Sequence, residues 1–320
     1  MNEEVFMAIK KDLPGVQKDV AMADHTTFKI GGPAEYFFIA RSEKEIITAL
    51  KTAQKLNIPV FIFGGGSNLL ISDNGIKGLV VKIENDDITL VSDDVIEAGA
   101  GVTMAQLVSF SIDNSLQGLE WAGGLPGTFG GAIRGNAGAF GGETKDSIFQ
   151  VTALDHDLNI KKFNNTECRF SYRNSVFKAM GWIILSAHVK LKKGDKEELQ
   201  AIAQSHINYR KEKHPLEYGS AGSIFKNIPV ETLRPEFQKE FADKVKQDPF
   251  PIVPAAWFVI GAGLTGMEIG EAQISTKHSN YIVNKGRATV KDVLALIDVA
   301  KQKIKEKYHI DLEVEVQIVN

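Results

Sequence analysis

The sequence has little cysteine, little net charge and no long apolar run. Its 320 residues include one cysteine, Cys168, which cannot form an internal disulfide, and this is typical of a reducing compartment such as the cytoplasm. A formal net charge of −3 excludes a broad basic surface for nucleic acid or an anionic membrane. No apolar stretch approaches the roughly 18 residues of a membrane-spanning helix, and the N-terminus lacks the apolar core of a signal peptide. We therefore expect a cytoplasmic protein without a nucleic-acid or membrane partner. Separately from these features, we expect a monomer.

Metal-binding patterns are missing as well. The seven histidines show no H-E-x-x-H spacing, and Cys168 has no second cysteine with which to hold zinc. The sequence therefore predicts no metal site.

Glycine, by contrast, is abundant, and its 29 residues are clustered. The first cluster lies in PVFIFGGGSNLLISD (59–73), where three glycines follow a strand-like run. A dinucleotide-binding turn needs a third spaced glycine and then a helix, but Leu69 takes that position and the next segment also reads as a strand. A P-loop would need a lysine, which does not follow. The remaining alternatives are a tight turn without a ligand and a different kind of ligand site.

A second glycine cluster favours a ligand site over a tight turn without a ligand. The stretch GGLPGTFGGAIRGNAGAFGGE (123–143) holds nine glycines, too many for a loop that only connects two elements. Both clusters also carry Ser, Thr or Asn side chains that can donate hydrogen bonds. Backbone amides that no side chain shields suit a long anionic ligand. The two clusters together therefore predict an anion-binding cleft lined by backbone.

The periodicity of the rest of the chain predicts an α+β protein with mixed sheets. Helical spacing marks 42–56, 103–115, 195–213 and 289–307. Strand-like runs lie at 60–63, 69–72, 78–83, 95–98, 149–154, 159–163 and 182–191. Residues 228–254 contain several prolines and charges, and we expect them to form an insertion or a linker.

The C-terminal run DLEVEVQIV (311–319) alternates strictly between apolar and polar residues. In a strand, such alternation places the two sets on opposite faces. We therefore expect one apolar face and one acidic face, which are formed respectively by Leu312, Val314, Val316 and Ile318, and by Asp311, Glu313, Glu315 and Gln317.

Six blocks of the sequence, in their order along the chain, resemble a known enzyme family. They are HTTFKIGGPAEYF (25–37), PVFIFGGGSNLL (59–70), GLPGTFGGAIRGNAGAFGGE (124–143), FSYRNSVFK (170–178), GSAGSIFKN (219–227) and LEVEVQIV (312–319). Together they are similar to the UDP-N-acetylenolpyruvoylglucosamine reductases, and the resemblance covers nearly the whole chain. The spacing of 50 residues between Arg173 and Ser223 resembles the shorter-loop subtype, which lacks an extra substrate-covering loop.

The resemblance implies a two-subdomain FAD-binding fold of the vanillyl-alcohol-oxidase or PCMH type, followed by a C-terminal α+β substrate domain. It places the first FAD-binding subdomain at 1–79, with the C-terminal strand as a candidate addition, and the second at 80–212. The substrate domain is expected at 213–320, with the insertion near 228–254 inside it. His25 belongs to the first block, where the family residue is structural, so we expect FAD to be bound non-covalently.

The activity implied by the resemblance is the NADPH-dependent reduction of UDP-N-acetyl-3-O-(1-carboxyvinyl)-glucosamine to UDP-N-acetylmuramate. This is a cytoplasmic step of peptidoglycan precursor synthesis, in which NADPH reduces FAD and FAD reduces the substrate. The resemblance assigns FAD binding to Gly64, Gly65, Gly66, Ser67, Asn68, Gly124, Pro126, Gly127, Thr128, Gly135, Asn136 and Gly138. It assigns substrate binding to Tyr218, Lys226 and Asn227.

The same resemblance assigns catalysis to Arg173, Ser223 and Glu315. Reduction of an enolpyruvyl ether develops negative charge on the ether carbon and its carboxylate, so it needs a cation and a proton donor. Arg173 can fork onto the carboxylate, Ser223 matches the proton donor, and Glu315 matches a carboxylate that stabilises the enol form. Each has an ordinary alternative: a surface ion pair, a loop serine bonded to its own backbone, and a solvated strand face. Alternation alone does not separate Glu315 from Glu313.

Two other functions stay open. An FAD-dependent alcohol or carbohydrate oxidase of the same fold would not need the three catalytic residues together. A non-catalytic module that binds flavin or a nucleotide sugar would hold a flavin that NADPH does not reduce. His214 stands before Pro215 where many relatives have glutamine, and we expect this difference to leave the chemistry unchanged.

Overall fold

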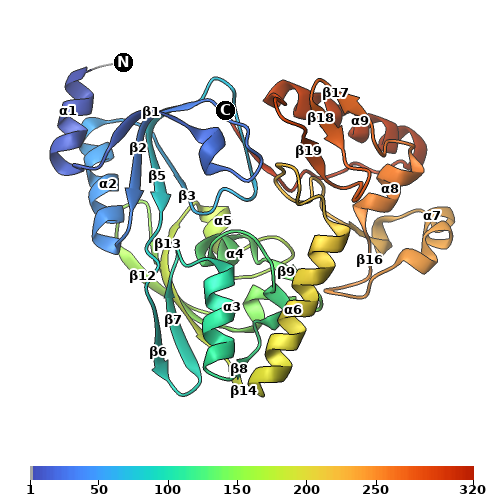
Figure 1. Ribbon diagram of the computed structural model, residues 1–320, viewed down its shortest axis with the longest axis horizontal. Coiled ribbons are helices and arrows are strands. Elements are labelled where there is room, and N and C mark those ends of the chain that lie inside the picture. Colours follow the sequence, from blue (N-terminus) through green and yellow to red (C-terminus); the bar gives the residue numbers. More distant parts are fainter. Residues whose placement is uncertain (1–2) are drawn as a thin grey trace. The chain divides into compact units, whose positions relative to one another are not determined.

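The structure is a computed structural model that describes residues 3–320, so the first two residues of the expected segment 1–79 lie outside the described part. Figure 1 shows the chain coloured from the N-terminus to the C-terminus. The chain forms two compact units, each built from segments that are discontinuous in sequence. Unit 1 comprises the chain up to Val20, Ala34–Gly65 and Ile76–Tyr209. Unit 2 comprises Ala21–Pro33, Gly66–Gly75 and Arg210–Asn320.

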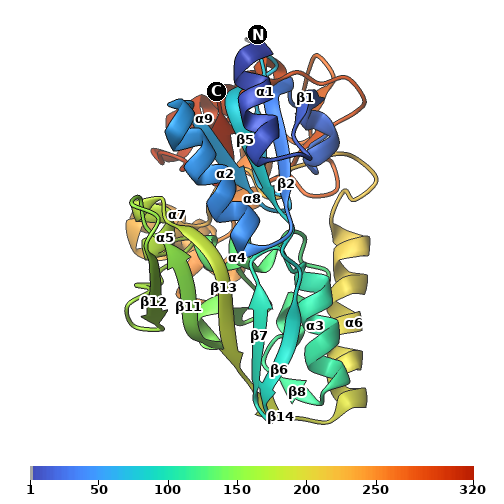
Figure 2. The same ribbon diagram turned by 90° about the vertical axis from the view of Figure 1, so that its left-hand side faces the viewer.

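One part of unit 1 is a four-stranded sheet with two helices beside it (Figure 2). The strand order is β1-β2-β5-β3, and β2 and β3 both run parallel to β5. Ser42 begins the second helix as predicted, because its side-chain oxygen accepts a hydrogen bond from the Glu45 amide. The elements are α1 (Glu3–Asp12), β1 (Gln17–Ala21), β2 (Pro33–Ala40), α2 (Glu43–Leu56), β3 (Val60–Phe63) and β5 (Ile76–Ile83).

The other part of unit 1 is an antiparallel sheet in the order β12-β11-β13-β7-β6. Its strands are β6 (Ile88–Ser92), β7 (Val95–Gly99), β11 (Ile148–Leu154), β12 (Ile160–Asn164) and β13 (Ile183–Lys190). Helices accompany it: α3 (Met104–Asp113), α4 (Phe129–Gly135), α5 (Val176–Met180) and α6 (Lys196–Lys213), with short 3-10 turns η2 (Glu120–Ala122) and η3 (Thr144–Asp146). Two short strand pairs join β8 (Leu116–Gln117) to β14 (Lys192–Lys193) and β9 (Gly138–Ala139) to β10 (Gly142–Glu143).

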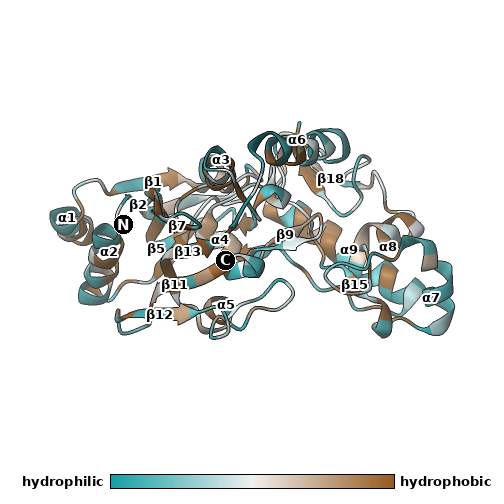
Figure 3. Cartoon of the chain, turned by 90° about the horizontal axis from the view of Figure 1, so that it is seen from below, coloured by the Kyte–Doolittle hydropathy of each residue, from teal (hydrophilic) through white to brown (hydrophobic). Residues whose placement is uncertain are grey.

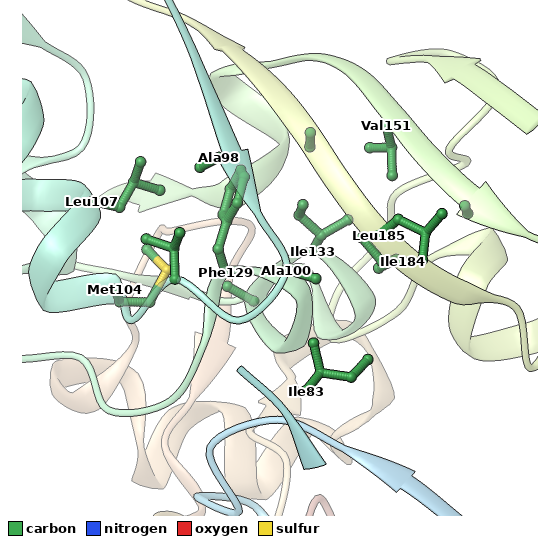
Figure 4. Packing of buried hydrophobic residues seen from close by; sticks show 14 of the residues in the cluster. Ile83, Ala98, Ala100, Met104, Leu107, Phe129, Ile133, Val151, Ile184 and Leu185 are labelled. Carbon is green, nitrogen blue, oxygen red and sulfur yellow. The ribbon is translucent and has the colours of Figure 1, made fainter. Parts of the chain in front are cut away.

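The core of unit 1 lies between this sheet and its helices. Figure 4 shows Phe129 and Ile133 of α4 beside Ala98, Ala100 and Leu185 of the strands and their ends. All five side chains are buried. Burial of a phenylalanine or isoleucine side chain contributes about 1.5–3 kcal/mol, so α4 is held in place chiefly by its apolar face.

Unit 2 has its own hydrophobic core, whose buried residues are distinct from those of the unit 1 core. Strands β17 (Glu268–Ile269), β18 (Ala272–Ile274) and β19 (Ile282–Asn284) form one sheet, and β4 (Leu69–Ile71) pairs in parallel with β20 (Gln317–Val319). The helices are α8 (Ala255–Gly261), α9 (Val290–Tyr308) and the short η1 (Met22–His25). Thr289 and Asp292 form a reciprocal capping box at the start of α9, which confirms the helix predicted from 289.

The proline-bearing stretch 228–254 is a folded insertion in unit 2. It contains β15 (Ile228–Pro229), η4 (Val230–Thr232), α7 (Pro235–Glu240), η5 (Ala242–Lys244) and β16 (Ile252–Val253). Its two ends pair with each other, Ile228 with Val253 and Pro229 with Ile252. Leu233 and Phe241 are buried in the core of unit 2, so the insertion packs as part of the unit.

Two expectations about local structure were wrong. The glycine-rich stretch 123–143 was expected to be loop, but α4 runs through it because Phe129 and Ile133 supply an apolar helix face. The C-terminal alternation was expected to continue through Ile318. Instead Ile318 is 38% exposed and Val319 is 7% exposed, because the backbone bends at Val316 before β20 pairs with β4.

Hydropathy follows the elements closely. In Figure 3 the helices α1, α2 and α7 carry hydrophilic surfaces, whereas β5 and β13 are mainly hydrophobic. Within residues 3–320, none of the helices combines the length and the apolar character needed to cross a membrane.

Candidate active site

The two glycine clusters meet within unit 1. A Cβ added at Gly64 would overlap the Thr128 side chain, and one at Gly65 would lie 2.8 Å from the Cα atom of Gly127. Both distances are shorter than real Cβ contacts, so only glycine permits this approach at 64 and 65. The structure thereby brings together two loops that are more than sixty residues apart in sequence, as the prediction of one cleft requires.

Backbone amides in both loops have no acceptor within the part of the chain that the structure describes. In unit 1 these are the amides of Gly64, Gly65, Gly127 and Thr128. In unit 2 the amides of Gly66, Ser67 and Asn68 likewise have no acceptor among the described residues. Backbone N–H groups are obligatory donors, and adjacent amides in a turn attract anions. The four amides of unit 1 fit the pyrophosphate of a dinucleotide such as FAD.

Other residues assigned to FAD have different surroundings. A Cβ at Gly135 would meet no atom within 4 Å, so the space beside it is open. Asn136 is fully buried and ends α4 in the left-handed conformation. Its side chain donates to the Ser171 carbonyl oxygen at 3.1 Å and accepts from the Lys145 amide at 3.0 Å. The Asn136 side chain therefore joins two protein segments, which is a structural use of this residue.

Arg173 occupies a strained position in a tight turn of unit 1. Ser171 and Asn174 exchange both backbone hydrogen bonds at 3.1 Å, and Arg173 between them has φ of 54°. Positive φ at a residue other than glycine is uncommon and costs about 1–2 kcal/mol. The guanidinium donates to the Gly138 carbonyl oxygen at 3.1 Å. The turn thus presents Arg173 beside a glycine that was assigned to FAD.

Ser223 lies in an extended segment of unit 2 that is bonded on both sides. On one side Ser223 pairs with Tyr281, and the Ile224 amide donates to the Asn280 carbonyl oxygen at 2.8 Å. On the other side the Glu315 amide donates to the Ile224 carbonyl oxygen at 2.8 Å. The structure therefore places Ser223 and Glu315, which are 92 residues apart in sequence, on adjacent backbone segments.

Asn280 fixes this segment and was not identified from the sequence. Its Oδ1 accepts from the Phe225 amide at 3.0 Å, and its Nδ2 donates to the Phe225 carbonyl oxygen at 2.8 Å. The residue is only 3% exposed. A buried amide that satisfies both backbone groups of one residue sets the register of the segment two residues beyond Ser223.

The two candidate glutamates differ in their partners. Glu313 forms an ion pair with Lys226. Glu315 holds its segment through its backbone, since its carbonyl oxygen accepts from Asn68 Nδ2 at 3.1 Å. Sequence alternation alone left these residues equivalent. In the folded chain the ion pair with Lys226 distinguishes Glu313 from Glu315.

A partly buried aromatic cluster lies next to Ser223 and is formed by His214, His278 and Tyr281, of which Tyr281 is buried. The Tyr281 hydroxyl lies 3.1 Å from Nδ1 of His214. Burial raises the pKa of Tyr281 to about 12. Burial, together with nearby cations, lowers the pKa of His214 to about 4, and burial also lowers the pKa of His278. At neutral pH these groups are therefore uncharged hydrogen-bonding side chains.

The sequence did not point to this cluster. The histidine at position 214 was expected to leave the chemistry unchanged, and the KHSNY stretch (277–281) carried no recognised pattern. The only sequence signal was the histidine before Pro215, and in the structure its Nδ1 atom is hydrogen-bonded to the Tyr281 hydroxyl.

The residues assigned to the substrate all lie in unit 2. Tyr218 is 44% exposed, and Lys226 is paired with Glu313. The Asn227 side-chain oxygen accepts from the Ala255 amide at 3.2 Å, which ties the end of the Ser223 segment to the start of α8. Within the described residues, no group of three or more His, Cys, Asp or Glu side chains is arranged to hold a metal ion.

Comparison with protein families gives two matches. Residues 214–319 match the model of the UDP-N-acetylenolpyruvoylglucosamine reductase C-terminal domain. Residues 34–163 match the model of an FAD binding domain. The glycine loops of unit 1 fall within the second range, and Ser223, Asn280 and Glu315 fall within the first.

Curated relatives are similar over almost the whole chain. UDP-N-acetylenolpyruvoylglucosamine reductase of Caldanaerobacter subterraneus subsp. tengcongensis is 40% identical over 298 residues, which covers 93% of this chain and 91% of the relative. The enzyme of the same name from Clostridium novyi is 37% identical over 308 residues, covering 96% and 93%. Among solved structures, the Thermus caldophilus UDP-N-acetylenolpyruvylglucosamine reductase is similar with a TM-score of 0.75 and 29% identity, covering 95% of this chain and 99% of that one.

Proposed function

This chain belongs to the UDP-N-acetylenolpyruvoylglucosamine reductase family, and we propose that Arg173, Ser223 and Glu315 carry out the reduction for which the family is named. The chain is an FAD-dependent oxidoreductase of peptidoglycan precursor synthesis, with NADPH as co-substrate. It reduces UDP-N-acetyl-3-O-(1-carboxyvinyl)-glucosamine to UDP-N-acetylmuramate. The pairing of the Ser223 segment with the Glu315 segment carries the assignment of residue roles.

The cofactor is held mainly by backbone in this proposal. The amides of Gly64, Gly65, Gly127 and Thr128 would donate to the pyrophosphate of FAD, since they have no acceptor among residues 3–320. When bound, FAD supplies the hydride that the enolpyruvyl double bond receives. Asn136 supports the neighbouring loop from its buried position.

Arg173 binds the carboxylate of the enolpyruvyl group. Negative charge spreads into that carboxylate during the reaction, and a guanidinium can meet it with two parallel N–H donors. The turn from Ser171 to Asn174 holds the backbone of Arg173 in one conformation. Lysine would offer a point charge on a more flexible stem, so arginine suits this role better.

Ser223 gives its hydroxyl proton to the carbon that bears the ether oxygen. Within residues 3–320 the Ser223 hydroxyl makes no hydrogen bond to another residue, so it is available to a ligand. A serine hydroxyl is a weak acid, but a carbanion-like centre is a strong base, and the serine recovers a proton from water afterwards. Glu315 stabilises the enol form by hydrogen bonding.

We extend the proposal to domain roles and location. Residues 1–79 and 80–212 bind FAD, residues 213–320 bind the nucleotide sugar through Tyr218, Lys226 and Asn227, and the enzyme works as a monomer in the cytoplasm. Gly124 and Pro126 lie in the same loop as Gly127, which closely approaches Gly65, and Gly138 lies beside the Arg173 guanidinium.

Purified protein tests the function directly. We expect a yellow flavoprotein whose consumption of NADPH, followed at 340 nm, rises strongly when the enolpyruvyl nucleotide sugar is added. Flavin-loaded protein that oxidises NADPH at the same rate with and without this substrate would contradict the proposed function. Oxidation of alcohols or carbohydrates with oxygen as acceptor would support an oxidase of the same fold instead.

A further inference from the structure

Ser223 lies between a glycine and two buried residues of unit 2. Gly222 before it has φ of 77°, a conformation that glycine adopts without steric cost. Ile224 and Phe225 after it are buried, at 1% and 3% exposure. Glycine restrains the backbone less than any other residue, so the position of the Ser223 hydroxyl depends chiefly on the groups that hold residues 224 and 225.

On one side, backbone hydrogen bonds hold these two residues. The Glu315 amide donates to the Ile224 carbonyl oxygen at 2.8 Å, and the Lys226 amide donates to the Glu313 carbonyl oxygen at 2.9 Å. Phe225 lies between these bonds and pairs with Val314. An antiparallel ladder therefore continues past Phe225 on this side.

On the other side, the backbone ladder ends early. Ser223 pairs with Tyr281, and the Ile224 amide donates to the Asn280 carbonyl oxygen at 2.8 Å. The neighbouring chain is a turn at this point, because the Tyr281 amide donates to the His278 carbonyl oxygen at 2.9 Å. The backbone before Asn280 therefore does not continue as a strand beside Phe225.

The side chain of Asn280 takes the place of the missing strand. Its Oδ1 accepts from the Phe225 amide at 3.0 Å, and its Nδ2 donates to the Phe225 carbonyl oxygen at 2.8 Å. The asparagine side chain is itself an amide, so it offers the same donor and acceptor as a backbone peptide group. Asn280 is 3% exposed, and such bonds are strongly favoured where water cannot replace them.

We propose that Asn280 is a positioning residue for the proton donor: its side-chain amide fixes the register of residues 223–226 and thereby places the Ser223 hydroxyl at the carbon that receives the proton. This inference rests on the proposed function, because it takes Ser223 as the donor. Proton transfer needs a donor within hydrogen-bond reach of the reacting atom, and a displacement of about 1 Å can slow such a step by about 10²-fold.

Asn280→Ala tests the proposal in the FAD-loaded enzyme. A stopped-flow instrument measures the two half-reactions separately through the flavin absorbance. We expect reduction of the enolpyruvyl nucleotide sugar to slow by about tenfold to hundredfold, because the Ser223 hydroxyl is no longer held in place. Reduction of the flavin by NADPH should keep its original rate, since that step does not use Ser223.

The same substitution in a Ser223→Ala chain distinguishes positioning from general damage. This chain has no hydroxyl left to position, so Asn280→Ala should slow its substrate reduction by less than about twofold further. A merely structural role would instead slow substrate reduction by the same factor in both chains.

Asn284→Ala is the matched control. Asn284 is a second buried amide of unit 2, whose Nδ2 donates to the Phe28 carbonyl oxygen at 3.3 Å and whose Oδ1 accepts from the Ala288 amide at 3.0 Å. Its side chain thus makes the same kinds of bonds to residues outside 223–226. We expect a comparable fall in the unfolding midpoint and no selective slowing of substrate reduction.

Asn280→Gln decides the question if the alanine variant does not fold. Glutamine keeps the donor and the acceptor on a side chain that is one carbon longer, so both bonds to Phe225 form only if the segment shifts. We expect this variant to fold and to slow substrate reduction by about tenfold.

Substrate reduction at the original rate in Asn280→Ala, or in Asn280→Gln if the alanine variant is unfolded, would overturn the proposal. Equal slowing of the two half-reactions would also overturn it, as would a slowing that persists in full in the Ser223→Ala chain. Failure of the proposed function gives a different result, because the original chain itself would then leave the enolpyruvyl substrate unreduced.

Discussion

The side chain of Asn68 is bonded to the backbone of Glu315. Asn68 Nδ2 donates to the Glu315 carbonyl oxygen at 3.1 Å, and the Asn68 carbonyl oxygen accepts from the Gln317 amide at 3.0 Å. These bonds continue the parallel pairing of β4 with β20. A residue from the first glycine cluster therefore fixes the segment that carries the proposed catalytic carboxylate, and both lie in unit 2.

Asn68→Ala removes the side-chain bond to that segment. We expect the free energy of unfolding to fall by about 1 kcal/mol, which is the usual net value of one such hydrogen bond. Turnover is expected to fall more than NADPH-dependent flavin reduction, because Glu315 serves only the step on the substrate. Denaturant unfolding and separate measurement of the two half-reactions provide the check. Asn74→Ala, in the exposed turn after β4, is the control and should leave both half-reactions unchanged.

Ser223→Ala separates the two half-reactions more sharply. NADPH should still reduce the flavin at the original rate, whereas reduction of the enolpyruvyl substrate should slow by about 10²–10⁴-fold, the range for loss of a general acid. Flavin absorbance in a stopped-flow instrument follows both steps. Ser220→Ala is the matched control, since the structure uses Ser220 through its backbone carbonyl oxygen. Unchanged substrate reduction in Ser223→Ala would assign the proton donor to another group.

Arg173→Gly tests whether strain and function coincide at one residue. Glycine adopts φ of 54° without steric cost, so relief of strain opposes the loss of the bond to Gly138. We expect the free energy of unfolding to stay within about 1 kcal/mol of the original value, while turnover of the enolpyruvyl substrate is lost. Thermal unfolding and steady-state kinetics measure the two effects. A variant that keeps substantial turnover would remove Arg173 from the proposed mechanism.

Gly64→Ala should disturb the contact between the two glycine loops. The added methyl group would overlap Thr128, so we expect lower stability and weaker retention of FAD. Thr128→Ala removes the side-chain oxygen in the way, and the double variant should recover part of the loss. FAD content after gel filtration and unfolding of the FAD-free protein measure the two effects, and a double-mutant cycle extracts the coupling. Strictly additive effects would show that the two residues do not meet.

His214→Gln should change how stability depends on pH. The pKa of His214 falls from 6.5 to about 4 on folding, so between these values the unfolded chain binds a proton that the folded chain does not. Stability contributed by neutral His214 is therefore present above pH 6.5 and is lost as the pH falls toward 4. His278 acts in the same direction.

Glutamine cannot be protonated in this range, and its amide oxygen can still accept from Tyr281. The variant should therefore lose less stability than the original chain between pH 6.5 and pH 4, as measured by denaturant unfolding at several pH values. His309→Gln is a suitable control, because this histidine ends α9 outside the cluster. Parallel stability curves for His214→Gln and the original chain would contradict the neutral state of His214.

Much of the site could be predicted where the signal was local. The strand before Gly64 and the strand after Asn68 are β3 and β4, so the dinucleotide fingerprint was correctly rejected. Thr103 and Thr289 begin helices through capping boxes, because a cap depends on residues three positions apart. The ordered blocks of residues identified the family, which the comparisons confirm.

The sequence alone did not reveal contacts that join distant segments. Asn280 clamping Phe225, Tyr281 bonded to His214, and Gly65 packed on Gly127 each depend on backbone brought together from far along the chain. The direction of Ile318 was wrong for a similar reason, since pairing with β4 after a bend overrode the local alternation. By itself the sequence therefore determined the helices, most strands and the family, because periodicity, caps and residue blocks are properties of neighbouring residues. Tertiary structure alone decided which glutamate pairs with Lys226, which backbone segments flank Ser223 and how the insertion folds back, because hydrogen bonds between distant segments exist only once the chain has folded.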